Sequence, residues 1–167
     1  MPLVVDADGL NALAPSPETP NTASLLRRAA PTVVTPHPGE MARLVVLKVA
    51  DVQAARLATA RGFAADTGAI VVLKGQRTIV AHPDGRAAVN PTGNPGLATG
   101  GTGDVLAGVI GALLARGADA WRGASASVYL HGHAGDRAAS RQGEESLIAG
   151  DLLDELPAAL RSLTGRG

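Results

Sequence analysis

The chain has 167 residues, a normal length for one domain that buries a sizeable core. Fifteen basic side chains balance fifteen acidic ones, so no net field favours nucleic acid or an anionic membrane. The lack of cysteine excludes disulfides and thiolate metal sites, and the N-terminus lacks the basic start and long apolar run of a signal peptide. We therefore predict a cytoplasmic protein with neither nucleic-acid nor membrane partners.

The N-terminal half predicts short strands that alternate with helices. Residues 69–75 (AIVVLKG) form a continuous β-branched run between glycines, typical of a strand that is buried on both faces. Pro38 suits the start of a helix through its fixed φ, and Glu40 suits the first turn through the helix dipole. The other elements predicted in this half are strands at 2–5 and 32–35 and helices at 24–29 and 51–66.

The C-terminal half predicts a hairpin, a glycine-dense loop and three helices. The hairpin turns at residues 83–85 (PDG), and the glycines of the loop lie between Gly93 and Gly103. Strands that alternate with helices indicate an α/β fold with a mainly parallel sheet. The three helices are expected at about 102–116, 120–141 and 149–163.

Polar segments follow each of the three predicted parallel strands. They are DADG at 6–9, TPHPGE at 35–40 and KGQRT at 74–78. Because ligands of such sheets bind beyond the carboxyl ends of the strands, we expect these segments to line one site.

The glycine loop leads directly into a helix, with Asp104 in its first turn. A helix N-terminus carries unpaired amides and a partial positive charge, and glycines let a phosphate approach those amides closely. An acid beside a phosphate site is explained if it accepts a proton from an attacking hydroxyl. We favour this interpretation over a capping aspartate in a flexible loop, which does not need so many glycines.

The other polar segments leave alternatives open. Residues 74–78 fit a turn around a nucleotide and fit a hairpin turn with a solvated lysine equally well. His37, held between two prolines, fits a binding residue or a surface turn, and Glu40 fits a dipole partner or an indirect magnesium ligand. Capping is the better interpretation of Asp6. His131 and His133 are two residues apart on a helix, face different sides and do not form a metal pair.

Four segments in this order carry a family resemblance: VVDADGLNAL, TPHPGEMARL, VVLKGQRTIVA and NPTGNPGLATGGTGDVLAG. They resemble the ADP/ATP-dependent NAD(P)H-hydrate dehydratases of the ribokinase-like superfamily, over nearly the whole chain. The resemblance implies a three-layer α/β/α fold. It implies a lyase that restores NADH or NADPH from the S epimer hydrated at ring carbon 6. ADP or ATP, with Mg²⁺, would phosphorylate the ring hydroxyl before phosphate is eliminated.

The resemblance also implies the roles of individual residues. Asp104 would be the catalytic base that contacts the hydroxyl of the substrate, and His37 would contact the hydrated dinucleotide. The residues expected to bind the nucleotide are Gly101, Thr102 and Gly103 in the glycine loop and Lys74, Gly75, Gln76, Arg77 and Thr78 after the third strand.

The start of the chain departs from the family pattern. Family members carry further residues before the DADG strand, so we expect residues 1–167 to be the C-terminal part of a single domain. The strand at 2–5 reads as central, which predicts that a neighbouring chain or a preceding segment covers its edge. We therefore expect a homo-oligomer. The rival functions are a ribokinase-like small-molecule kinase and a non-catalytic adenylate-binding module.

Overall fold

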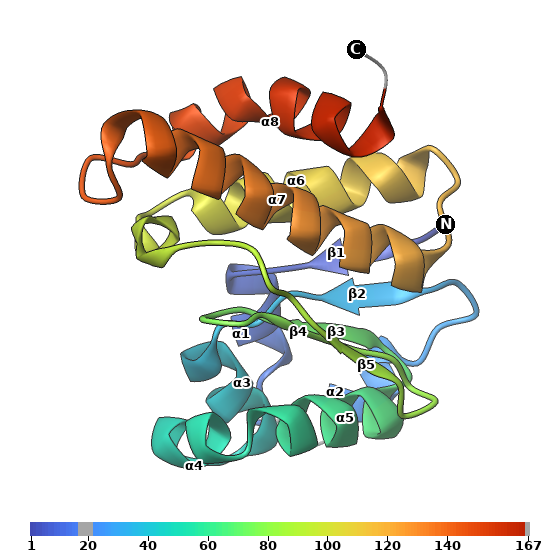
Figure 1. The fold of residues 1–167 in the computed structure, drawn as a ribbon. Coiled ribbons are helices and arrows are strands. Elements are labelled where there is room, and N and C mark those ends of the chain that lie inside the picture. Colours follow the sequence, from blue (N-terminus) through green and yellow to red (C-terminus); the bar gives the residue numbers. More distant parts are fainter. Residues whose placement is uncertain (17–21, 166–167) are drawn as a thin grey trace.

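The structure, a computed structural model, describes residues 1–16 and 22–165. In this part of the chain five short strands form one sheet in the order β1-β2-β3-β4-β5, with helices on both faces (Figure 1). The strands are β1 (Leu3–Val5), β2 (Thr32–Val34), β3 (Ile70–Leu73), β4 (Ile79–Ala81) and β5 (Ala87–Val89). The helices are α1 (Asp8–Leu13), α2 (Thr22–Leu26), α3 (Pro38–Val45), α4 (Val49–Ala54), α5 (Arg56–Thr67), the 3₁₀ helix η1 (Pro95–Ala98), α6 (Thr102–Ala115), α7 (Ala120–Gln142) and α8 (Ala149–Thr164).

The two faces of the sheet build two separate hydrophobic cores. Val34 and Val71 pack among side chains of α3 and α5, whereas Val33, Ile70 and Val72 pack against α6 and α7. Helix α8 packs on the side of α6 and α7 that faces away from the sheet (Figure 1). The predicted three-layer α/β/α fold is therefore confirmed, and the strand at 70–73 is buried on both faces as its apolar run predicts.

The sheet is parallel in its first part and antiparallel in its second. Strands β1, β2 and β3 run parallel, while β4 and β5 form an antiparallel hairpin beside β3. The hairpin turns where the sequence predicts it, because Gly85 takes a φ of 91° and Asp84 accepts a hydrogen bond from the backbone amide of Arg86.

One local prediction needs correction. The helix expected at 51–66 is two helices, separated at Ala55 with φ −131° and ψ 37°. The Arg56 guanidinium at the start of α5 donates to the carbonyls of Leu73 and Lys74 at 3.2 and 3.3 Å, so this helix start is fixed to the end of β3. Strand β1 lies at the edge of the sheet within the described residues, with Leu3 40% exposed, and the expected cover of this edge by another segment stays a prediction.

Helices α7 and α8 are joined by a carboxylate between two guanidinium groups. The side chain of Glu155 on α8 is only 5% exposed and accepts hydrogen bonds from Arg141 and, at 2.8 Å, from Arg137. The bond from Arg141, followed by that from Arg137, lowers the pKa of Glu155, although desolvation opposes this shift.

No helix in the described part of the chain has both the length and the apolar character needed to cross a bilayer.

We expect Glu155→Gln to remove a pH-dependent part of the stability. Because the pKa of Glu155 is lower in the folded than in the unfolded chain, its contribution is present above the ordinary carboxyl range and is lost as the pH falls through the lowered pKa. Urea unfolding should show the variant less stable than the wild type at neutral pH, with a smaller difference at about pH 3. The exposed neighbour Asp154→Asn is the control, and an equal deficit of Glu155→Gln at both pH values would contradict the prediction.

Candidate functional site

The predicted site lies at the carboxyl edge of the parallel strands. Lys74, directly after β3, donates from Nζ to Oδ1 of Asp6 at 2.7 Å, and Asp6 directly follows β1. The same Nζ lies 3.8 Å from Oε2 of Glu40 in the segment after β2. The side chains of Lys74 and Asp6 are only 19% and 13% exposed, so this pair is largely withdrawn from water. Three segments that are distant in the sequence therefore meet at one point, as predicted.

The start of α6 faces this ion pair. A Cβ atom added to Gly103 would lie 3.4 Å from Nζ of Lys74 and 3.8 Å from Oδ2 of Asp6. The structure thus brings together Lys74 and Gly103, two residues that the family resemblance predicts to bind one nucleotide. A side chain at Gly103 would occupy the space between the helix start and the ammonium group.

Glu40 and His37 form a reciprocal cap at the start of α3. His37 Nδ1 accepts from the amides of Gly39 and Glu40 at 2.9 and 3.3 Å, while Oε2 of Glu40 accepts from the His37 amide at 2.7 Å. The acceptor role of Nδ1 leaves Nε2 as the protonated nitrogen of a neutral ring. The side chain of His37 is half-exposed at 49%, and its Nε2 lies 3.6 Å from Oε1 of Glu40. Sequence reasoning did not foresee that this histidine is the capping residue.

The first turn of α6 presents backbone amides without a side-chain cap. Gly101 occupies the N-cap position with a left-handed φ of 86°, and helix geometry leaves the amides of Thr102, Gly103 and Asp104 without intrahelical acceptors. The Thr102 side chain is buried, and its hydroxyl is directed at the carbonyls of Leu97 and Thr99 at 2.8 and 3.0 Å. Any contact of Thr102 with a ligand therefore comes through its backbone.

His131 supports this turn from α7. Its Nε2 lies 2.9 Å from the carbonyl oxygen of Thr102, and the side chain is buried. Burial lowers the pKa of His131, although its bond to Thr102 acts in the opposite direction. The neutral ring therefore donates from Nε2 to the carbonyl. His133, two residues later, bonds to Ser162 Oγ instead, so the two histidines have separate partners.

Asp104 differs from the paired carboxylates of the site. It is exposed, and no hydrogen bond or ion pair of its side chain occurs within residues 1–16 and 22–165. A carboxylate with open coordination beside uncapped amides is able to accept a proton from a bound hydroxyl group.

The turn after β3 is closed on itself. The Thr78 hydroxyl donates to the Gly75 carbonyl at 3.0 Å, and Gln76 and Arg77 are exposed. Gly75 has a φ of 130°, and a Cβ there would lie 2.6 Å from the guanidinium of Arg56, so this position requires glycine. No hydrogen bond or ion pair joins Gln76 or Arg77 to the glycine loop in the described residues, whereas Nζ of Lys74 lies beside Gly103.

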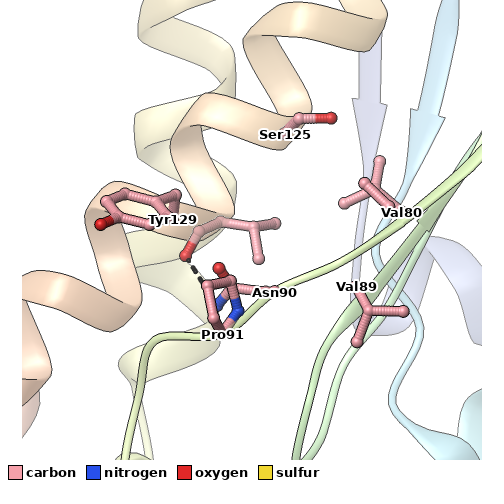
Figure 2. Close-up of a pocket in the computed structure, with 8 residues that line it drawn as sticks. Val80, Val89, Asn90, Pro91, Ser125 and Tyr129 are labelled. Carbon is pink, nitrogen blue, oxygen red and sulfur yellow. Dashed lines mark hydrogen bonds between the residues drawn. The ribbon is translucent and has the colours of Figure 1, made fainter.

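A cavity of about 130 Å³ lies between the hairpin and α7 (Figure 2). Its walls are largely apolar, and the buried Ser125 hydroxyl on α7 has no hydrogen-bond partner in the structure. Asn90 Nδ2 donates to the Val128 carbonyl at 3.4 Å and fixes the end of β5 to α7. The lining residues are Val80, Ala88, Val89, Asn90, Pro91, Ser125, Val128 and Tyr129.

The sequence did not predict that polar side chains of α7 hold the loop before η1. Asp136 accepts from the Gly93 amide and from Asn94 Nδ2 at 2.9 and 3.0 Å, which holds the loop before η1. A Cβ at Gly132 would lie 2.3 Å from Thr92 Oγ1, so the loop and the helix touch directly. Glycine inside a helix is unfavourable by roughly 0.5–1 kcal/mol relative to alanine. The presence of Gly132 inside α7 was therefore a signal in the sequence that another segment packs closely at this position.

The carboxylates of Asp6 and Glu40 suit Mg²⁺ only if an anionic ligand supplies the other ligands of the metal. Asp6 and Glu40 place two carboxylates around one ammonium group, and carboxylate oxygens are ligands that Mg²⁺ prefers. In the described part of the chain no three His, Asp or Glu side chains gather closely enough to hold a metal by themselves. The residues therefore fit magnesium that is carried by phosphate groups, not a cage made by the protein.

Comparison with known proteins gives a consistent picture. The family described as NAD(P)H-hydrate dehydratase matches residues 1–158. The chain is 50% identical over 163 residues to a bifunctional NAD(P)H-hydrate repair enzyme of Moorella thermoacetica, and 47% identical over 165 residues to an ADP-dependent (S)-NAD(P)H-hydrate dehydratase of Neisseria meningitidis. These matches cover 98% and 99% of the chain, which spans 30% and 54% of the two relatives.

Solved structures agree on the fold. An ADP/ATP-dependent NAD(P)H-hydrate dehydratase of Bacillus subtilis, co-crystallised with ATP/Mg²⁺ and soaked with CoA, matches with a TM-score of 0.86 and 36% identity. A ribokinase-like superfamily protein of Enterococcus faecalis matches with a TM-score of 0.72 and 28% identity. They cover 97% and 95% of the chain, which spans 56% and 52% of their lengths. The predicted ribokinase-like fold is confirmed.

We expect Lys74→Met to destabilise the protein because it leaves Asp6 without its cation. The loss should be on the order of 1–3 kcal/mol, the usual penalty of a largely buried polar group without a partner. The double variant Lys74→Met with Asp6→Asn should lose less than the sum of the single variants in urea unfolding. Lys48→Met, at an exposed position, is the control. Additive losses in the double variant would show that the ion pair does not couple the two loops.

Proposed function

Because the chain belongs to the NAD(P)H-hydrate dehydratase family, we propose that it serves the nucleotide-dependent repair of hydrated NADH and NADPH. The substrate is the S epimer hydrated on the nicotinamide ring, and ADP, or alternatively ATP, is the co-substrate. The relatives named for this reaction support the proposal, since the chain matches them over nearly all of its own length. The chain spans about half of these relatives, and we propose that residues 1–167 form one part of their domain.

The observation that carries the proposal is the meeting of Lys74 with the uncapped start of α6. A phosphate at this point receives amide hydrogens from Gly101, Thr102 and Gly103 and the charge of the ammonium group. Gly103 keeps the approach open because any side chain there points at Lys74. An anion that bears several oxygens, such as the terminal phosphate of ADP, makes use of all these donors.

We place the base of the nucleotide in the cavity beside the hairpin. Its apolar walls suit the faces of an aromatic ring, and the unpartnered Ser125 hydroxyl supplies a polar contact at the edge of the ring. The turn of Gly75, Gln76, Arg77 and Thr78 lies at the same edge of the sheet, where it wraps the sugar and inner phosphate.

The chemistry follows from the position of Asp104 beside these amides. Asp104 accepts the proton of the ring hydroxyl as its oxygen attacks the terminal phosphorus of ADP. A new P–O bond forms, the bridging P–O bond breaks, and AMP leaves with the bond electrons. The phosphorylated carbon then loses phosphate with the C–O bond electrons, and the adjacent ring carbon loses a proton to restore the double bond. The hydroxyl oxygen leaves within the phosphate, and the two protons of the eliminated water leave through Asp104 and from the adjacent ring carbon.

The remaining parts of the proposal concern the metal and the substrate. Magnesium would be carried by the nucleotide phosphates and would neutralise their charge, and Asp6 and Glu40 would hold its water ligands. The half-exposed side chain of His37 would contact the hydrated dinucleotide. A homo-oligomer joined along the edge of β1 and a cytoplasmic location, where both ligands occur, stay predictions from the sequence.

The test is incubation of the protein with hydrated NADH, ADP and magnesium. The proposal expects the absorbance of reduced nicotinamide to return and AMP to form in equal amount. Accumulation of a phosphorylated product without that absorbance would indicate a small-molecule kinase instead. Nucleotide binding without any turnover would indicate a non-catalytic adenylate-binding module.

We expect Asp104→Asn to lower the rate of dehydration by about 10²–10⁴-fold, the usual contribution of a general base. The affinity for ADP should stay nearly unchanged, because the backbone amides of the loop remain. The rate is measured from the return of nicotinamide absorbance, and the affinity by calorimetry. Asp119→Asn, at the start of α7 and away from the loop, is the control. Full activity of Asp104→Asn would exclude the assigned base.

We expect Ser125→Phe to fill the cavity and to weaken the binding of ADP and of adenosine alike. A loss of about tenfold or more corresponds to at least about 1.4 kcal/mol of lost contact with the base. Ala126→Phe places the same ring on the exposed side of α7 and serves as the matched control. If Ser125→Phe binds both ligands like the wild type, the base lies elsewhere.

A further inference from the structure

The buried His131 contacts the glycine loop at a single backbone atom. Its Nε2 lies 2.9 Å from the carbonyl oxygen of Thr102, which is 29 residues away in the sequence. Such a contact sets the position of the loop but does not touch a ligand. Its consequence depends on which other group shares the peptide unit with that oxygen.

The peptide unit that contains the Thr102 carbonyl also contains the Gly103 amide. The chain has no cis peptide bonds among its described residues, so this unit is planar and its C=O and N–H bonds point in opposite directions. A hydrogen bond that fixes the carbonyl oxygen therefore also fixes the direction of the Gly103 hydrogen. That hydrogen points out of the first turn of α6, where a Cβ atom on Gly103 would lie 3.4 Å from Nζ of Lys74.

Other contacts leave this peptide unit little freedom. The Thr102 hydroxyl is directed at the carbonyls of Leu97 and Thr99, so the side chain before the peptide is fixed as well. Gly103 itself has no side chain that could be held by neighbours. Within α6 the Thr102 carbonyl also accepts the amide of Leu106, as helix geometry requires, and His131 is the side chain outside α6 that adds a second bond to this oxygen.

We propose that His131 is a positioning residue, which aims the Gly103 amide at the terminal phosphate of the bound nucleotide. This inference rests on the proposed nucleotide site. The imidazole acts through the backbone and touches neither the nucleotide nor the substrate. Its effect is specific to the phosphate end of the ligand, because the base lies in the cavity beside Ser125.

The test compares ADP with adenosine, which lacks phosphate but keeps the base and sugar. His131→Leu removes the donor, and we expect its affinity for ADP to fall by about tenfold, the effect of misaligning one hydrogen bond to a charged group. Its affinity for adenosine should change by less than about twofold. His131→Gln, which keeps an N–H donor of similar reach, should restore most of the ADP affinity. His133→Leu, which removes the bond to Ser162, is the matched control and should change neither affinity.

Other outcomes would overturn the inference. An equal loss of ADP and adenosine binding would mean that His131 only supports the fold, and unchanged ADP binding would mean that the Gly103 amide needs no support. If His131→Leu does not fold, His131→Asn replaces it, because that side chain is polar but too short to reach the carbonyl. If the wild type binds adenosine but gains no affinity from the phosphates of ADP, the proposed phosphate site fails, and this inference fails with it.

Discussion

The ion pair between Lys74 and Asp6 is the contact on which the geometry of the site depends. It joins the ends of β1 and β3 across the intervening β2, and it lies beside Glu40 and Gly103. Parallel strands bring their carboxyl ends to one edge, but this alone does not decide which side chains meet there. Lys74 determines which side chains meet at this edge, because a largely buried ammonium group needs carboxylates within hydrogen-bonding distance. The loops after β1, β2 and β3 and the start of α6 therefore all lie beside the same ammonium group.

Helix α7 is the second organising element. It holds the segment before η1 through Asp136, the end of β5 through Asn90, and the start of α6 through His131. These segments differ widely in sequence position and carry few bonds to one another. A single long helix therefore fixes the loop that closes the site, and the sheet fixes the loops that form its floor.

Much of this arrangement was predictable from the sequence, for physical reasons that act locally. The apolar run at 70–73 has no polar face, so a strand buried on both sides is its natural structure. Pro38 and the glycines around 100–103 restrict or free the backbone at the residue where they stand, and they mark the starts of α3 and α6 correctly. The roles of the residues of the glycine loop and of the turn at 74–78 rest on the family resemblance together with these signals, and they stay predictions.

What escaped prediction depends on partners that are distant in the sequence. Nothing near His131 indicates that its ring reaches the Thr102 carbonyl, and nothing near Ser125 indicates an apolar cavity. The break at Ala55 interrupts a helical pattern that continues on both sides, and the bonds from Arg56 to the end of β3 become visible only in the folded chain.

The fixed distance between Ser125 and His131 along α7 has a consequence for the release of the proposed nucleotide product. The two residues are separated by about 9 Å of helix axis, at roughly 1.5 Å per residue, so the base site and the phosphate loop cannot approach each other. In the proposed site, a nucleotide that had given up its terminal phosphate would keep its contact with the cavity but would lose its contact with the Gly103 amide. The product would then be held at one end only, which would favour its release.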